Sequence, residues 1–348
     1  MNIIPEPEAD RGGPAQPLLI LRNMKKHFPL RGGARVHAVD GVSFSIAKGE
    51  TLGVVGESGC GKSTLARLLM LLMPQDAGEM IFDGDPVGGV RGISPAALRR
   101  QVQMVFQDSS SSLNPRLPVQ DSVAFGPMVH GHPRARALAI AQEALRQVNL
   151  DPALIGPRYP HELSGGQKQR INIARALAIG PRMVVLDEAV SALDKSVQAQ
   201  VLNLLLRLRR ELDLTYLFIS HDLAVVRHIS HRVLVMYLGK VMEVGPVAQV
   251  FARPLHPYTR ALLASRPSMD PRKRTETLPV SGDPPNPVDL PPGCRFAPRC
   301  RHVEAVCTAA LPALLAPPGA ADQAHLGACL MHVPGSGHSA APVLDAVA

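Results

Sequence analysis

The sequence contains no tryptophan, and aromatic residues make up only 3% of its 348 residues. This shortage argues against the aromatic stacking platforms with which many proteins bind single-stranded nucleic acid. The formal net charge of +8 is modest and forms no long basic run. We therefore expect an ordinary soluble surface and no nucleic-acid partner.

Long hydrophobic runs are absent as well. A membrane-spanning helix needs about 20 apolar residues, and the longest candidate, 65–73, is short and contains Arg67. The first residues do not have the basic and apolar segments of a secretory signal. We therefore expect a cytosolic chain with no membrane span of its own.

Cysteine is scarce outside one region near the C-terminus, and only Cys60 stands apart from it. A reducing cytosol disfavours disulfides, and the spacing lacks the C-x2-C pairs of common zinc sites. From spacing alone, a metal site, free structural thiols and disulfides all remain open, with nearby histidines as additional ligands for zinc. The clustered cysteines are Cys294, Cys300, Cys307 and Cys329, and the histidines are His302, His325 and His332.

Short β-rich runs alternate with helical patterns between about residues 18 and 250, which is typical of an α/β domain. The expected strands are 18–24, 41–46, 50–55, 101–106, 182–187, 215–220 and 232–237. The expected helices are 62–73, 134–149, 165–179, 195–212 and 222–230. Residues 265–292 then contain eight prolines and indicate a linker or an extended loop.

The strongest local signal is GESGCGKS at 56–63, which fits the pattern G-x-x-x-x-G-K-[ST] between a β-rich run and a helical pattern. Its glycines permit backbone conformations that a Cβ would forbid, so successive N–H groups can turn toward an anion. The next helix points its positive N-terminus at the same place. We expect Lys62 to reach the β- and γ-phosphates of a nucleotide and Ser63 to offer its hydroxyl to Mg²⁺. Cys60 could be an activated thiol, but a tolerated small residue is the simpler interpretation.

Two adjacent acids end the apolar run MVVLDE. Asp187 fits the carboxylate that holds the Mg²⁺ shell in P-loop proteins, and Glu188 could accept a proton from an attacking water. A second anion-binding helix start is LSGGQ, where Ser164 can cap the helix and Gly165–Gly166 leave N–H groups free. Two such sites within one monomer are redundant, and two chains placed head to tail would resolve the redundancy.

The motifs GESGCGKST, LSGGQ, VVLDE, SALD and LFISHD follow in the order and spacing of ABC-type ATPase subunits, which the chain resembles over about 18–265. The resemblance implies an α/β P-loop NTPase fold with a RecA-like core, an antiparallel β subdomain and a helical subdomain at about 108–178. It also implies a dimer that sandwiches two ATP molecules with Mg²⁺. Each ATP would lie between the phosphate loop of one chain and four residues of the other, Ser164, Gly165, Gly166 and Gln167.

The resemblance also implies roles for single residues. The catalytic group would be Glu188, His221 and Gln107, and Ser63, Gln107 and Asp187 would serve Mg²⁺. Asp194 would lie between subunits, and Phe28 would stack on adenine, with core packing as the alternative for this side chain. The remaining nucleotide-binding residues would be Gly56, Glu57, Ser58, Gly59, Cys60, Gly61, Lys62, Ser63 and Thr64.

The segments FQDSSSSLNPR, YPHELSGGQKQR and HPYTRALL look like those of ATPase subunits of bacterial oligopeptide/dipeptide (and nickel) importers. This resemblance implies a subunit that powers import of peptides, or a related small solute, at the cytoplasmic face of the inner membrane. Its partners would be a second ATPase subunit (identical or a sister chain), two transmembrane permease subunits and, indirectly, an extracytoplasmic solute-binding protein. A soluble ABC ATPase of translation or DNA maintenance is the alternative function.

The same family carries a C-terminal extension with a similar cysteine set. The resemblance implies that the four clustered cysteines hold a [4Fe–4S] cluster, with Zn²⁺ as the alternative, in a structural role. The expected domains are a flexible tail at 1–17, the ABC ATPase domain at 18–265, the extension at 266–333 and a second flexible tail at 334–348.

Overall fold

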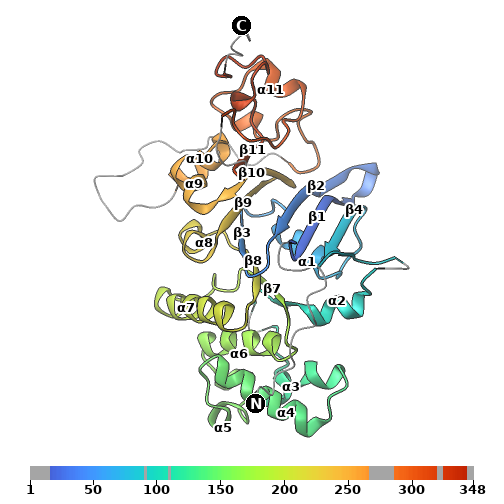
Figure 1. Cartoon of the computed structure of the whole chain (residues 1–348), viewed down its shortest axis with the longest axis vertical. Helices are drawn as coiled ribbons and strands as arrows, with labels where there is room; N and C mark the ends of the chain where they lie inside the picture. Colours follow the sequence, from blue (N-terminus) through green and yellow to red (C-terminus); the bar gives the residue numbers. More distant parts are fainter. Residues whose placement is uncertain (1–15, 90–91, 109–110, 266–285, 320–323, 343–348) are drawn as a thin grey trace.

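A computed structural model describes residues 16–89, 92–108, 111–265, 286–319 and 324–342 (Figure 1). Most of the expected N-terminal tail and the first part of the expected extension, 266–285, lie outside these residues. The described chain forms a central sheet, a smaller sheet beside it, a group of helices at one end and an irregular C-terminal region at the other end (Figure 1).

The central sheet is built on parallel strands that are buried on both faces, which explains their continuous apolar runs. In spatial order they are β9 (Arg232–Tyr237), β3 (Thr51–Val55), β8 (Thr215–Ile219), β7 (Met183–Asp187) and β6 (Val102–Val105). The antiparallel strands β10 (Lys240–Pro246) and β11 (Leu326–Gly327) continue the sheet beyond β9. Parallel strands present their carboxyl ends at one edge, so the loops after β3, β6, β7 and β8 meet there.

The smaller sheet is antiparallel and comes from the N-terminal part of the chain. Its order is β2 (Arg35–Ile46), β1 (Leu19–Pro29), β4 (Ala77–Phe82) and β5 (Asp85–Pro86). Leu21 of β1, Phe82 of β4 and Leu52 of the central sheet belong to one buried core. This core holds the smaller sheet against the strand that leads into the phosphate loop.

The helices separate into two groups. The first group packs together at the end of the molecule away from the C-terminus (Figure 1) and consists of α3 (Val119–Val129), α4 (Arg134–Gln147), α5 (Pro152–Ile155) and α6 (Gly165–Leu177). The second group comprises α1 (Lys62–Leu69), α2 (Pro95–Gln101), α7 (Lys195–Glu211), α8 (Leu223–Ile229), α9 (Val247–Ala252) and α10 (Pro257–Ala264). Helix α6 of the first group contacts both β6 and α7, so it joins this group to the sheet.

Each strand and helix expected from the sequence is present, but some elements were not predicted. Helix α1 ends at Leu69, earlier than expected, because Leu71 takes a left-handed backbone conformation with φ 51°. Helix α3 was missed because it contains Gly126 and Pro127 and lacks a clear polar face. Strands β4 and β10 were also missed, and β10 follows β9 across a tight turn at Leu238 and Gly239.

The described C-terminal region has little regular structure beyond α11 (Ala305–Ala309) and β11. It is nevertheless tied to the rest of the chain, because β11 pairs with β10 of the central sheet. Residues 334–342, where we expected a tail, also make contacts. His338 Nε2 lies 2.9 Å from the carbonyl oxygen of His302, and the backbone N–H of Ser339 donates to Glu304.

Candidate active site

The loop between β3 and α1 fits tightly against two other strands. Gly61 has φ 107°, and a Cβ on it would lie 1.9 Å from the carbonyl oxygen of Ala38 in β2. A Cβ on Gly56 would lie 2.2 Å from the carbonyl oxygen of Met236 in β9. Both positions therefore require glycine, and the loop can keep its backbone N–H groups close to a bound anion.

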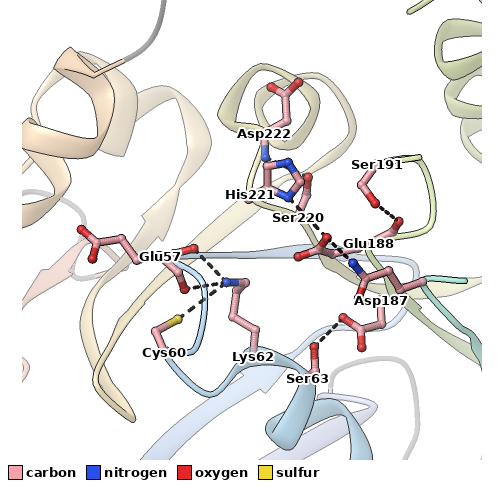
Figure 2. Close-up of polar contacts among 12 residues, drawn as sticks. Glu57, Cys60, Lys62, Ser63, Asp187, Glu188, Ser191, Ser220, His221 and Asp222 are labelled. Carbon is pink, nitrogen blue, oxygen red and sulfur yellow. Dashed lines mark hydrogen bonds and ion pairs between the residues drawn. The ribbon is translucent and has the colours of Figure 1, made fainter. Parts of the chain in front are cut away.

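Lys62 is buried under this loop, although it is charged. Its Nζ donates to the carbonyl oxygens of Gly56, at 2.8 Å, and Glu57, at 2.9 Å (Figure 2). The thiol of Cys60 lies 3.8 Å from the same nitrogen, and burial raises the pKa of this thiol despite the nearby ammonium. A protonated, buried thiol is a poor nucleophile, so the structure favours the interpretation of Cys60 as a small packing residue.

Ser63 and Asp187 come together from α1 and the end of β7. The hydroxyl of Ser63 donates to Oδ1 of Asp187 at 3.1 Å (Figure 2). Burial raises the pKa of Asp187, and the neighbouring charge of Glu188 adds to this effect, while the Ser63 hydrogen bond opposes it. A hydroxyl and a buried carboxylate are the oxygen ligands that Mg²⁺ prefers, so this pair fits the expected metal.

Glu188 is the meeting point of the other predicted catalytic residues. The side-chain amide of Gln107, after β6, donates to its Oε2 at 3.0 Å, and Nδ1 of His221, after β8, lies 3.3 Å from the same oxygen (Figure 2). Glu188 has φ 49°, which is unusual for a residue with a side chain. Backbone strain of this kind, held by a bond from its N–H to Ile219, fixes the carboxylate beyond the strand end.

Lys62, Ser63 and the Glu188 cluster border one cavity of about 510 Å³, a size typical of small-molecule sites, whereas Asp187 lies behind Ser63 and outside its lining. Its floor is the phosphate loop, and its rim carries the side chains that end β6, β7 and β8. The lining residues are Ala38, Ser58, Gly59, Gly61, Lys62, Ser63, Thr64, Gln107, Glu188 and His221. The fold thus brings together residues that are up to 183 positions apart in sequence, counting from Ala38 to His221.

The LSGGQ segment does not border this cavity in the single chain. Ser164 caps α6, since its Oγ accepts from the backbone N–H of Gln167 at 3.3 Å. In return, the side-chain Oε1 of Gln167 accepts from the backbone N–H of Ser164 at 3.0 Å. A Cβ on Gly166 would lie 2.5 Å from Val197 of α7, so this glycine allows the two helices to pack closely. Asp194 is exposed and caps α7 through a 2.9 Å bond from Val197 N–H.

Phe28 also lies outside the lining residues. It stands near the end of β1 with 36% of its surface exposed, which argues against the alternative that it is a core residue. The ammonium of Lys26 lies 5.8 Å from its ring centroid. The ring is therefore available at the edge of the β1–β2 hairpin, but the structure does not bring it to the phosphate loop.

The four clustered cysteines border a second, much smaller cavity of about 20 Å³. Burial is the main cause that raises the pKa of Cys294 and of Cys329 to about 11, and the other thiols add to it. Among the described residues, no three of these sulfur atoms lie within 4.8 Å of one another. The ligands of one tetrahedral zinc ion lie about 3.8 Å apart, as Zn–S bonds of about 2.3 Å require, so these thiols do not form a closed zinc site in the described conformation.

The histidines near these cysteines differ from those expected. His302 borders the small cavity, but His325 pairs with Glu243 at 2.8 Å and His332 contacts the carbonyl oxygen of Leu255 at 2.8 Å. His256, which the sequence did not single out, is fully buried, and this burial lowers its pKa to about 4. Its Nδ1 accepts from the N–H of Tyr258, so the proton of the neutral ring is on Nε2, 3.9 Å from the sulfur of Cys294.

Two further residues touch the phosphate loop and were missed in the sequence. The N–H of Glu57 donates to the hydroxyl of Tyr258 at 2.9 Å, and Arg299 holds the Glu57 carboxylate at 2.9 and 3.0 Å. Tyr258 belongs to the segment HPYTRALL, which entered the sequence analysis only through the family resemblance. Arg299 stands beside Cys300. Neither residue had a spacing signal, because each lies more than 200 positions from Glu57.

One other group has the spacing of metal ligands among the described residues, namely His27, His37 and Asp40. However, Asp40 already forms ion pairs with Arg295 and Lys240. The charge of this carboxylate is therefore balanced, and we interpret the group as an ion-pair network between β2 and the C-terminal region.

Comparisons with known proteins agree over most of the chain. Residues 39–191 match the family model described as ABC transporter, and residues 242–307 match the one described as Oligopeptide/dipeptide transporter, C-terminal region. The probable peptide ABC transporter ATP-binding protein y4tS of Sinorhizobium fredii is 48% identical over 326 residues, which cover 89% of this chain and 90% of that protein. The oligopeptide transport ATP-binding protein AppF of Bacillus subtilis is 47% identical over 307 residues, which cover 85% of this chain and 92% of AppF.

Solved structures with a similar fold include cbiO1 of Clostridium perfringens, described as part of the ABC transporter complex cbiONQ. It is 28% identical with a TM-score of 0.60 and covers 68% of this chain and 91% of that chain. A dimeric ATP-binding cassette in a post-hydrolysis state with ADP and Pi is 27% identical with a TM-score of 0.57. The match covers 66% of this chain and 98% of that chain. The described fold therefore agrees with that of ABC transporter proteins, one of which was solved as a dimer with ADP and Pi.

Proposed function

The chain belongs to the ATP-binding proteins of ABC transporters, and on this premise we propose that it powers the import of peptides through separate membrane-spanning subunits. As a member of this family it is an ATPase that uses ATP and Mg²⁺. The observation that carries the proposal is the single cavity on which Lys62, Ser63, Glu188 and His221 converge. The peptide cargo is inferred from relatives that are named as peptide transport proteins and from the matched C-terminal region.

The phosphate loop and Lys62 bind the triphosphate. In the described conformation Lys62 Nζ is held by the carbonyl oxygens of Gly56 and Glu57, so it is already placed beneath the loop. It exchanges these partners for phosphate oxygens with little movement. Ser63 and Asp187 hold Mg²⁺, which screens the phosphate charge, and the bound metal favours the ionised form of Asp187.

Glu188 is the general base for hydrolysis. Its carboxylate accepts a proton from the water that attacks the γ-phosphate, while Gln107 and His221 hold the same carboxylate from opposite strands. His221 is also within reach of the γ-phosphate from the rim of the cavity. Because Gln107 follows β6 and leads into the helical group, it can transmit the state of the nucleotide to that group.

A second ATPase chain completes the site. The helix start with Ser164, Gly165, Gly166 and Gln167 lies outside the cavity of its own chain, so it is available for the ATP of a partner. Asp194 is exposed at the start of α7, the helix against which Gly166 packs, so it lies beside this interface. One of the solved structures of similar fold is itself a dimer, which supports the same arrangement here.

The membrane-spanning subunits dock on the helical group. Phe125 and Val129 of α3 are 60% and 64% exposed, and they lie one helical turn apart on one face. Phe106, at the end of β6, is 41% exposed. Large exposed apolar side chains of this kind suit the docking of a partner helix. No helix in the described part of the chain could cross a membrane. With separate membrane-spanning subunits as partners, the subunit acts at the cytoplasmic face of the inner membrane.

The four clustered cysteines hold a metal group in the C-terminal region. Four thiols around one small cavity fit a [4Fe–4S] cluster in ligand number and type, with Zn²⁺ as the alternative. When bound, the cluster stabilises the thiolate forms of the cysteines. His256 assists by directing its Nε2–H toward Cys294. The role is structural, since the cysteines do not border the nucleotide cavity.

Replacing Glu188 with glutamine tests the catalytic assignment. Glu188→Gln should keep ATP affinity within about threefold of the native protein and lower the hydrolysis rate by at least ~100-fold, the usual contribution of a general base. Both values can be measured with a fluorescent ATP analogue and a phosphate-release assay. Glu143→Gln, on the exposed surface of α4, is the matched control and should hydrolyse ATP normally. Native turnover by Glu188→Gln would show that another group is the base.

Co-purification separates the transport function from the alternative in translation or DNA maintenance. The tagged chain should be recovered with integral membrane proteins from detergent-solubilised membranes. Recovery with ribosomes or DNA instead would contradict the proposal.

A further inference from the structure

Glu57, the second residue of the phosphate-loop motif, is held by the C-terminal part of the chain at two points. Its backbone N–H donates to Tyr258 of α10, and its carboxylate takes both contacts from one nitrogen of Arg299. Its carbonyl oxygen accepts from Lys62. One residue thus joins the lysine that binds phosphate to two side chains that the catalytic mechanism does not use.

Both side chains are rigidly placed. Arg299 is only 9% exposed in its side chain, and it also donates to the hydroxyl of Tyr237 at 3.2 Å. Tyr237, Tyr258 and Phe296 pack as three aromatic rings with centroids 4.5 to 5.5 Å apart. A buried charged contact backed by packed rings does not rearrange freely, so it can fix the position of the loop that it touches.

The same two side chains lead directly to the cysteine region. Arg299 precedes Cys300, and Phe296 follows Cys294 in the same short segment. Tyr258 bonds through its N–H to His256, whose other ring nitrogen faces Cys294. The segment 294–300 therefore contacts the phosphate loop on one side and the small cysteine cavity on the other.

We infer that Arg299 and Tyr258 are positioning residues for the phosphate loop, and that through Glu57 the segment 294–300 sets the affinity for ATP. This inference rests on the proposed ATPase function. The loop contacts the phosphates in the ground state and the transition state alike, so loosening it removes uniform binding. The effect therefore falls on the dissociation constant and KM for ATP and leaves kcat nearly unchanged.

A variant series on the full-length chain tests the inference. Arg299→Ala should raise the dissociation constant and KM for ATP by about five- to tenfold, as expected for coupled sites, and change kcat less than about twofold. Arg299→Lys keeps the charge and should recover part of the affinity. Tyr258→Phe keeps the ring cluster and should raise the KM by about threefold. The matched control is Arg260→Ala, an arginine of α10 that faces the same surface groove as Arg299 and whose side chain donates to the carbonyl oxygen of Pro254.

A double-mutant cycle separates positioning from general loosening of the fold. Glu57→Gln should resemble Arg299→Ala, and the two changes together should weaken ATP binding no more than either one alone, because they remove the same contact. Additive losses, or an equal fall in kcat, would overturn the inference. A native protein that neither binds nor hydrolyses ATP would overturn the proposed function instead. If the native protein is active but Arg299→Ala and Tyr258→Phe bind ATP with normal affinity, the inference is wrong and the proposed function stands.

Discussion

The nucleotide cavity and the cysteine cavity differ in size, in exposure and in the ionisation of their lining groups. The first has about 510 Å³ and an open rim, where the side chain of His221 is 60% exposed. The second has about 20 Å³, and burial raises the pKa of Cys294 and Cys329 in its lining. An open polar cavity suits a ligand that enters and leaves, whereas a closed cluster of thiols suits a group that stays with the protein.

The two cavities also differ in how they are held together. The nucleotide cavity is assembled at the edge of a parallel sheet, where strand order brings the loops together. The cysteine cavity has little regular structure around it and depends on side-chain contacts such as His256 with Cys294. Replacing a single binding side chain should therefore impair function at the nucleotide cavity and structure at the cysteine cavity.

The largest effect is expected at the phosphate loop. Lys62→Ala should weaken ATP binding by at least ~100-fold, which corresponds to about 2.7 kcal/mol, because a buried charged donor to the phosphates is lost. The fold should persist, since the change leaves the apolar core intact. Titration with a fluorescent ATP analogue measures the affinity, and circular dichroism checks the fold. Arg146→Ala, which removes an exposed cation from α4, should bind ATP normally. Retention of ATP binding by Lys62→Ala would contradict the assigned role of the loop.

The next effect concerns the cysteine cavity. Cys329→Ser should prevent anaerobic reconstitution with iron and sulfide, measured by visible absorbance and acid-labile sulfide, whereas Cys60→Ser should reconstitute normally. Metal uptake must displace thiol protons, because the pKa values of about 11 keep Cys294 and Cys329 protonated at neutral pH. Uptake should therefore weaken as pH falls from 8 to 6. A protein that binds one Zn²⁺ and no iron would support the zinc alternative.

Residues that act within one contiguous motif were predictable from the sequence. GESGCGKS and MVVLDE each combine an apolar strand with the polar groups at its end, so both the element and the chemistry can be read from adjacent residues. The cap on α6 by Ser164 was predictable for the same reason, since its partner Gln167 lies three residues away.

Contacts between distant segments were not predictable. Arg299 meets Glu57 across 242 positions, and Tyr258 meets it across 201, so no local pattern reports either contact. From the sequence, the cysteines had only a structural role as a metal site, with no link to the ATP site. The fold changes this interpretation, because the central sheet continues through β10 and β11 and brings the cysteine region against the phosphate loop.

The smallest predicted effect is on thermal stability, at two aspartates of the nucleotide-binding machinery. Burial raises the pKa of Asp187, whereas hydrogen bonds from Val197 and Ser196 lower the pKa of Asp194. A raised pKa means that the folded state binds a proton more tightly than the unfolded chain, so the contribution of Asp187 to stability is present at low pH. It is lost as pH rises from the unfolded pKa through the folded one. For Asp194 the sign is reversed, and its contribution is lost as pH falls.

Asparagine substitutions should therefore move the melting temperature in opposite directions. Without nucleotide at pH 7.5, Asp187→Asn should raise Tm by about 2 °C, the size of a change of roughly 1 kcal/mol or less in a chain of this length, and Asp194→Asn should lower it slightly. The gain for Asp187→Asn should shrink toward pH 4, where the native carboxyl takes up its proton. With ATP and Mg²⁺ added, the native protein should melt at a higher temperature than Asp187→Asn. Only the native carboxylate can hold the metal and gain stability from binding. Thermal unfolding at pH 7.5 and pH 4, with and without ATP and Mg²⁺, measures these changes in Tm. A lower Tm for Asp187→Asn without nucleotide would contradict the prediction, because it would show that the fold stabilises the ionised carboxylate.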